Sequence, residues 1–370
     1  MARLEEICDI LDSRRIPITA SDRKPGPYPY YGANGIQDYV SDYIFDDDLV
    51  LLAEDGGNFG SKEKPIAYRV SGKCWVNNHA HVLKPKDMLD VDYLCYSLMF
   101  YDVSGLVNGA TRQKLTQADM RKMEIPLRSM SEQKRITAVI NKVSDLISLR
   151  KQQLAKLDEL VKSRFIELFG MPGADDFGWG LTPLGSICYI NPKKGQDPRL
   201  SSGVEVSFVP MPAVTERGEI DATAVKEYDE VKTGFTYFAE NDVLFAKITP
   251  CMENGKGAVA RGLHNGLGFG STEFHVLRPI SGKSNPYWIY TLTAFSQFRE
   301  DAASNMTGSA GQRRVPASFL ENYRVAVPPI GMQEQFAAFV EQTNKSKLAI
   351  QQSLDKMELL KKALMQKYFE

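Results

Sequence analysis

The chain of 370 residues contains an internal repeat, and a sequence that repeats itself over about half its length folds into two similar units. Residues 81–85 (HVLKP) match residues 275–279 (HVLRP), and residues 48–53 (DLVLLA) resemble residues 242–246 (DVLFA). The offset between matched residues is 180 near the start of each half, where residues 3–10 match residues 183–190. The offset rises to 194 at the matched residues His81 and His275, so the loops of the two halves differ in length.

Toward the end of each half the offset becomes nearly constant. Pro126 matches Pro328, and the Glu-Gln pair at residues 132–133 matches the pair at residues 334–335, with an offset of 202. Residues 154–169 then match residues 354–369 with an offset of 200. Each half therefore has a variable globular part followed by a tail of fixed length.

The globular parts indicate an α+β fold. Short apolar runs at residues 49–52, 204–209 and 274–277 are bounded by turn residues, which is typical of strands. Residues 91–100 and 287–298 are longer apolar stretches, and they predict one helix in each half. The sequence divides into a first globular domain at residues 1–128, a helix at 129–170, a second domain at 171–329 and a helix at 330–370.

The tails predict two long helices that pair as a coiled coil. Residues 131–169 contain no Gly or Pro, and apolar residues recur there every seven positions, which is the heptad repeat of a coiled coil. The motifs at residues 129–132 (SMSE) and 331–334 (GMQE) have the form of helix-capping boxes. Antiparallel pairing would give the molecule a pseudo-twofold axis; the alternative is that each tail packs on its own domain. The predicted helix–helix seam consists of Ile140, Ile147, Leu154, Val161, Phe336, Ile350, Leu354 and Met357.

Charge and cysteine content exclude several classes of protein. The net charge is −1, from 45 basic and 46 acidic residues, which argues against uniform electrostatic binding of nucleic acid but leaves a local basic surface possible. No apolar run reaches the ~18 residues of a membrane span, and the start lacks the apolar core of a secretory signal. Five scattered cysteines indicate reduced thiols. We therefore expect a cytoplasmic protein without membrane contact.

The doubled order of these motifs resembles the specificity subunit of type I restriction-modification systems. The resemblance is carried by residues 28–36 (YPYYGANGI), by residues 75–83 (WVNNHAHVL), and by the proline-containing strand ends at 125–127 and 327–329. A Glu-Gln pair and a long helix follow each of those strand ends. The likeness extends over essentially the full chain.

The resemblance implies a function in recognition, without chemistry of its own. Each globular part would be a target recognition domain that reads one half of a split sequence in double-stranded DNA. The helices would set the gap and bind two methyltransferase subunits, and through them the restriction subunits, in a complex that serves bacterial defence. S-adenosylmethionine, ATP and Mg²⁺ would belong to those partners and not to this chain. The first domain has little sequence ahead of residues 3–4, whereas the second has residues 175–182 before its equivalent point. Two alternatives follow: the edge of the first domain is thinner, or its lead-in comes from the returning second helix.

The residues themselves indicate no catalytic site and no metal site. Residues 285–288 (NPYW) lack one proline of the tetrapeptide that adenine methyltransferases use, and the glycines at 266–270 precede a strand-like segment rather than a helix. His79 and His81 would lie on one face of a strand with only Cys74 near them, too few ligands for zinc. His81 and His275 are expected to make the same structural hydrogen bond, once in each half. The acidic residues 46–48 are expected to lie in a solvated turn before a strand.

DNA contacts are predicted mainly in two glycine-hinged loops just before the long helices. Neck loop 1 is residues 109–115 and neck loop 2 is residues 308–315; both carry glutamine beside cations, which suits contacts with phosphates and base edges. The predicted DNA-binding residues are Tyr30, Tyr31, Asn34, Asn58, Lys62, Thr111, Arg112, Gln113, Lys114, Lys247, Asn254, Lys256, Thr272, Gln312, Arg313 and Arg314. Two alternative functions remain open: a fused or stand-alone methyltransferase or restriction enzyme, and a coiled-coil interaction scaffold.

Overall fold

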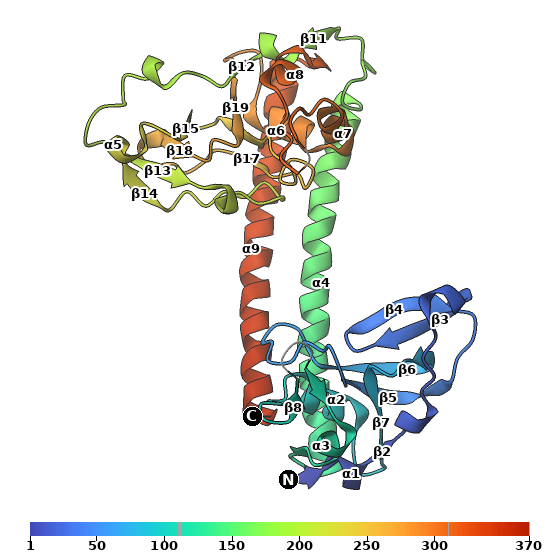
Figure 1. The fold of residues 1–370 in the computed structure, drawn as a ribbon. Helices are drawn as coiled ribbons and strands as arrows, with labels where there is room; N and C mark the ends of the chain where they lie inside the picture. Colours follow the sequence, from blue (N-terminus) through green and yellow to red (C-terminus); the bar gives the residue numbers. More distant parts are fainter. Residues whose placement is uncertain (110–112, 310, 370) are drawn as a thin grey trace. The chain divides into compact units, whose positions relative to one another are not determined.

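The computed structural model describes residues 1–109, 113–309 and 311–369, and the chain divides into two compact units. Unit 1 is Met1–Arg150 together with Ser353–Glu370, and unit 2 is Lys151–Gln352. Each unit combines sheet and helix (Figure 1), which confirms the predicted α+β class. Among the described residues, none of the helices combines the length and the apolar character that crossing a membrane requires.

Unit 1 is built on a six-stranded sheet with the order β2-β7-β5-β6-β3-β4. Its strands are β2 (Cys8–Ile10), β3 (Pro25–Gly32), β4 (Gly35–Val40), β5 (Phe45–Ala53), β6 (Ala67–Val76) and β7 (Ala80–Pro85). Two short pairs complete it: β1 (Ala2–Arg3) with β10 (Glu124–Ile125), and β8 (Val107–Asn108) with β9 (Lys114–Leu115). Its short helices are α1 (Leu4–Ile7), α2 (Val91–Met99) and α3 (Gln117–Arg121), and α2 confirms the helix predicted at residues 91–100.

Strand β5 shows how the sheet is covered on both faces. Val50 and Leu52 point into a core shared with α2, whereas Leu49 and Leu51 belong to a second cluster on the opposite face. The acidic residues 46–48 were expected in a turn, but they lie inside β5, paired with residues 71–73 of β6. The strand tolerates these carboxylates because cations meet them: Lys84 pairs with Asp47 at 2.6 Å.

Unit 2 contains two four-stranded sheets, with the orders β12-β19-β16-β17 and β14-β13-β18-β15. The strands of the first are β12 (Cys188–Ile190), β16 (Val243–Ala246), β17 (Gly257–Val259) and β19 (Phe274–Pro279). Those of the second are β13 (Glu205–Val209), β14 (Val225–Glu227), β15 (Thr236–Ala239) and β18 (Leu267–Gly270). The remaining elements are β11 (Leu181–Pro183), paired with β20 (Arg324–Ala326), and α5 (Tyr228–Val231), α6 (Pro286–Ala294), α7 (Ser296–Ser304) and α8 (Ala317–Asn322).

The single helix predicted at residues 287–298 is wrong, because the chain forms α6 and α7 there. The break is at Phe295, whose backbone is extended, with φ −68° and ψ 143°. That turn buries the Phe295 ring, which lies 5.1 Å from the ring of Phe165. Burial of an aromatic ring outweighs the continuation of a helix whose next residues are polar.

Two buried glutamines fix the correspondence between the repeats. Gln133 donates to the carbonyls of Met88 and Arg128 and accepts from the backbone of Asp90. Gln333 does the same with the carbonyls of residues 283 and 328 and the backbone of residue 285. Gln133 therefore corresponds to Gln333, with an offset of 200. The matches of Pro126 with Pro328 and of residues 132–133 with residues 334–335 are wrong by two positions.

The long helices are α4 (Met130–Phe169) and α9 (Ile330–Phe369), within a residue of the predicted bounds. The capping box of α4 is confirmed, since Glu132 and Ser129 exchange hydrogen bonds between side chain and backbone at 3.3 and 3.4 Å. The predicted glycine cap of α9 is wrong. Gly331 lies inside the first turn, and the carbonyl of Pro329 accepts the first hydrogen bond, from Met332.

Each unit holds the beginning of one long helix and the end of the other. In unit 1 the core includes Ile140 near the start of α4, and Leu364 and Tyr368 near the end of α9 pack against it. In unit 2 the core joins Val161 of α4 to Phe336 of α9. The two helices therefore run antiparallel, and the end of α9 packs against the core of unit 1.

The predicted seam residues differ in environment. Ile140, Val161 and Phe336 are buried in the cores of the units rather than in a free-standing coiled coil. Leu154 and Leu354 are buried, and Ile147, Ile350 and Met357 are partly buried. Within unit 2 an ion pair between Lys347 of α9 and Asp158 of α4 adds a polar contact between the helices.

Candidate nucleic-acid interface

The described ends of neck loop 1 lie at a pair of short antiparallel strands, β8 and β9. Asn108 of β8 pairs with Lys114 of β9, and the backbone of Gly109 has a φ of 101°, which favours glycine. Gln113 has an exposed side chain, and its carbonyl accepts from the backbone of Gly56 at 3.2 Å. The predicted contacts Thr111 and Arg112 lie outside the described residues.

The cation of neck loop 1 is partly neutralised. Lys114 lies 3.0 Å from a carboxylate oxygen of Glu54, the residue that follows β5, and about half of its side chain is exposed. Burial raises the pKa of Glu54, but hydrogen bonds from Arg15 and from Lys114 together hold that pKa below its usual value. Lys114 can face a phosphate while it remains bound to Glu54.

Neck loop 2 is closed by its own backbone and by a bidentate ion pair. The backbones of Thr307 and Arg314 exchange two hydrogen bonds, of 3.0 and 2.8 Å. The Arg314 guanidinium donates to both carboxylate oxygens of Glu273, with distances of 2.8 and 2.9 Å. This pairing lowers the pKa of Glu273 and raises that of Arg314. Arg314 therefore serves first to fix the loop.

Arg313 and Gln312 are the accessible side chains of neck loop 2. Arg313 is 47% exposed, and its ion pair with Glu253 spans 3.9 Å. Gln312 is exposed, and its carbonyl accepts from Arg314 at 3.2 Å. A weakly held guanidinium beside a free amide suits contacts with the sugar-phosphate backbone and base edges.

The other predicted residues of unit 2 gather around this loop. The carbonyl of Lys247 accepts from the backbone of Val315 at 2.9 Å, and the backbone of Lys247 donates to Glu273 at 2.9 Å. Lys256 accepts from the backbone of residue 246. Thr272 and Asn254 are exposed beside Glu273 and Glu253. The structure therefore brings these positions to the ends of β16 and β19.

In unit 1 the structure separates the predicted residues into two groups. Asn34 is exposed and donates to the carbonyl of Gly56, the residue that also binds neck loop 1. In the same loop Lys62 is exposed and Asn58 is partly buried. These three polar residues remain available to a ligand.

Tyr30 is wrong as a DNA contact. Its side chain is only 1% exposed, its hydroxyl hydrogen-bonds with the backbone of Ile18, and the guanidinium of Arg23 lies over its ring. Tyr31 is partly buried and stacks on Tyr68, with 5.8 Å between the ring centroids. These contacts favour the alternative that Tyr30 and Tyr31 belong to the core over the prediction that they contact DNA.

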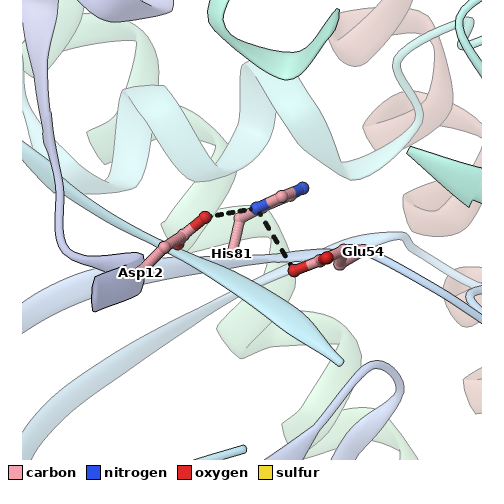
Figure 2. Close-up of side chains that lie close together, drawn as sticks. All are labelled: Asp12, Glu54 and His81. Atoms are coloured by element: carbon pink, nitrogen blue, oxygen red, sulfur yellow. Dashed lines mark hydrogen bonds and ion pairs between the residues drawn. The ribbon is translucent and has the colours of Figure 1, made fainter. Parts of the chain in front are cut away.

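A buried charged cluster supports neck loop 1, and sequence reasoning missed it. His81 hydrogen-bonds through Nδ1 to Asp12 at 2.6 Å, and the same nitrogen lies 3.7 Å from Glu54 (Figure 2). Arg15 pairs with Glu54 at 2.6 Å and with Asp12 at 3.5 Å. Only the repeat of His81 at His275 pointed to this place.

The cluster combines ligand types that bind metals, but its carboxylates are already paired with cations. Asp12, Glu54 and His81 have ligand atoms close enough together for one cation. Arg15 and Lys114 occupy the carboxylates, which disfavours a divalent ion there. His79 lies outside β7 and pairs with Asp55, so the two histidines use different partners.

The long helices carry exposed apolar side chains as well as buried ones. On α4, Val139, Leu146 and Leu149 are exposed within unit 1, and Leu160 and Ile166 within unit 2. On α9, Leu348 is exposed within unit 2 and Leu359 and Leu360 within unit 1. These side chains are accessible for contact with another protein.

Comparison with curated proteins finds restriction enzyme subunits. The chain is 45% identical over 154 residues to the type I restriction enzyme EcoEI specificity subunit of Escherichia coli, a match that covers 41% of this chain and 25% of that protein. It is 42% identical over 159 residues to the EcoAI specificity subunit, also from Escherichia coli, covering 43% and 26%. The matched part thus spans about a quarter of these relatives' length.

Solved structures share the fold over the whole chain. The type I restriction-modification S subunit from M. genitalium has a TM-score of 0.59 at 14% identity and covers 100% of this chain and 95% of its own. A chain from a study of complex assembly and conformational transition of the type I R-M system has a TM-score of 0.52 at 17% identity, covering 100% and 97%. The family described as the type I restriction modification DNA specificity domain matches residues 1–159 and again residues 178–359. The chain therefore belongs to the type I restriction modification DNA specificity domain family and contains this domain twice.

Proposed function

We propose that this chain is the DNA-recognition subunit of a type I restriction-modification complex and that it reads a target in two halves. The observation that carries the proposal is the doubled specificity domain, in which each copy presents an exposed glutamine in its neck loop, Gln113 in the first and Gln312 in the second. Each copy would read one half-sequence in the DNA grooves, and the cations beside the glutamines would contact phosphates.

Joining two reading units in one chain explains how modest contacts give a selective site. Once one unit is bound, the second binds at a high effective concentration that the connecting helices set. Because α4 and α9 are stiff helices of 40 residues each, the gap between the two half-sequences becomes part of the target.

The exposed apolar residues of the helices would bind two methyltransferase subunits. Those subunits would supply S-adenosylmethionine and extrude the target adenine, whose reactive atom is inaccessible in the duplex. Restriction subunits would join through them and use ATP and Mg²⁺. The chain itself would supply recognition without catalysis, in the cytoplasm.

A mobility-shift assay tests the proposal against the alternatives of an interaction scaffold and an enzyme. The chain is mixed with genomic fragments of its host, with and without the co-expressed methyltransferase subunits and a labelled methyl donor. The proposal expects selective shifts and methylation only when the partners are present. Partner binding without any DNA shift would identify a scaffold, and methylation by the chain alone would identify an enzyme.

A further inference from the structure

The two histidines of the repeat hold the ends of the two neck loops by the same bond. His81 donates from Nε2 to the carbonyl of Leu115 at 3.0 Å, and His275 donates from Nε2 to the carbonyl of Val315 at 2.8 Å. Both rings are buried, and both carbonyls belong to the last residue of a neck loop. The bond links the sheet of each unit to the segment proposed to contact DNA.

In unit 2 the other ring nitrogen of His275 faces an amide. Asn191 accepts from the backbone of Val276 through Oδ1 at 3.0 Å. Nδ1 of His275 lies 3.0 Å from Nδ2 of Asn191 and 3.3 Å from Oδ1, and the shorter contact is the one in which Nδ2 donates to Nδ1. A nitrogen that accepts carries no proton, so His275 has a single proton, on Nε2. Burial of the ring lowers the pKa of His275, in agreement with a neutral side chain.

In unit 1 the same ring nitrogen of His81 faces a carboxylate. Asp12 already accepts from the backbone of Val82 at 2.8 Å and from Nε2 of Gln117 at 2.9 Å, and Nδ1 of His81 lies 2.6 Å away. These donors and Arg15, 3.5 Å away, favour an ionised Asp12. With an acceptor at each ring nitrogen, the geometry requires a proton on both.

We propose that His81 and His275 are positioning residues for the neck loops, with His81 held as a doubly protonated ring and His275 as a neutral ring. The charged groups around His81 are Asp12, Glu54, Arg15 and Lys114, of which the last belongs to neck loop 1 itself. Through His81, neck loop 1 is joined to an ionic network. Through His275, neck loop 2 is joined to the neutral side chain of Asn191, and the charged groups that act on this ring are Lys247 and Glu273. The role in DNA contact rests on the proposed function; the protonation states do not.

Nitrogen-15 NMR of histidine-labelled full-length chain at pH 7 measures these states directly. The chain has four histidines, and H81Q and H275Q assign the two signals of interest. The expected spectrum shows two protonated nitrogens for His81 and one, Nε2, for His275. D12N should convert His81 to the single-proton form, and N191D should convert His275 to the double-proton form. Equal forms in the wild-type chain, or no response to D12N, would overturn the assignment.

DNA binding by the complete complex with its methyltransferase subunits tests the positioning role. H81F and H275F each remove the hydrogen bond from Nε2 and should each weaken binding to the specific target about tenfold. D12N keeps the Nε2 hydrogen bond of His81 and should therefore bind DNA as the wild type does. H264Q, which alters an exposed histidine paired with Glu205, is the control. Wild-type binding in H81F and H275F would refute positioning, whereas a wild-type complex that binds no DNA refutes the proposed function and leaves the NMR result to decide the protonation states.

Discussion

The ring of Phe369 at the end of α9 packs on the buried ring of Tyr93 in α2, with 5.1 Å between the centroids. The last turn of the chain therefore completes the core of the unit in which the chain begins. Phe169, 200 residues earlier at the end of α4, packs edge-on against Phe336 of α9 within unit 2, with 5.4 Å between the centroids. Both units therefore contain the end of a long helix, and for unit 1 this end lies about 200 residues beyond the rest of its sequence.

Replacing Phe369 with alanine should destabilise unit 1 while unit 2 keeps its stability. Because Phe369 is only partly buried, we expect a loss of about 2 kcal/mol, below the ~3–5 kcal/mol of a fully buried phenylalanine. Hydrogen exchange of peptides from α2 and from α6 measures the two units separately. F169A is the matched variant and should have the opposite pattern; equal effects on both units would contradict the assignment of the helix ends.

The buried glutamines Gln133 and Gln333 should contribute equally to the free energy of unfolding of their units. Q133L leaves the backbone N–H of Asp90 and two carbonyls without their partner, which should cost unit 1 about 3 kcal/mol. Q333L should cost unit 2 a similar amount. Denaturant unfolding followed by exchange in each unit provides the comparison, with K134Q as an exposed neighbouring control. If Q133L leaves the free energy of unfolding unchanged, the hydrogen bonds of Gln133 contribute nothing to the stability of unit 1.

The anchor of neck loop 2 should weaken in mild acid before that of neck loop 1. The pKa of His275 lies below the unfolded value of ~6.5, so its stabilising contribution is full above that pH and declines as the pH falls toward the folded pKa. The pKa of Asp12 is also lowered, so its contribution is full above ~3.9 and is lost only in stronger acid.

Hydrogen exchange of neck-loop peptides between pH 7 and 5, corrected for intrinsic rates, detects this difference. Protection should fall in peptides that cover residues 307–316 and remain in those that cover residues 105–116. H275Q should remove the pH response of the first set. A response confined to neck loop 1 would reverse the expected order.

The two arginines of neck loop 2 should differ in their effect on DNA binding. R313A removes a weakly held cation and should reduce the salt dependence of log K by ~1, equally for specific and unrelated DNA. R314A releases Glu273 and loosens the loop, so affinity should fall with a smaller change of slope. Titrations at several salt concentrations, with E273Q as the control for loop closure, compare the two. Identical slopes would refute this division of roles.

The sequence predicted the doubled α+β architecture because the internal repeat and the spacing of apolar residues directly reflect the repeat of the fold and the periods of helices and strands. The heptads defined α4 and α9 within a residue, and the capping residues Ser129 and Glu132 marked the start of the first. The break at Phe295 could not be predicted, because it depends on a contact with Phe165 from a distant element. The two-residue error in the repeat arose for a similar reason: only the contacts of Gln133 and Gln333 reveal their equivalence.

The candidate site was predictable in outline but not in detail. Glycine, glutamine and cations marked both neck loops, whereas the partners of those cations, Glu54 and Glu273, come from residues far along the chain. Tyr30 was misassigned because a tyrosine in a polar segment has the same pattern whether its ring faces solvent or the core. Burial depends on the sheet that surrounds the residue, which local sequence does not specify.

The spacing between the two half-sequences is tested most directly by lengthening both helices. Seven residues in heptad register are inserted after Arg150 in α4 and after Gln352 in α9, at the boundaries of the two units. Adenine methylation is then mapped across the genome for the wild-type and lengthened complexes. Seven residues add about 10.5 Å of helix, close to three base pairs of DNA. The account predicts unchanged half-sequences separated by a gap about three base pairs longer; altered half-sequences, or an unchanged gap, would contradict it.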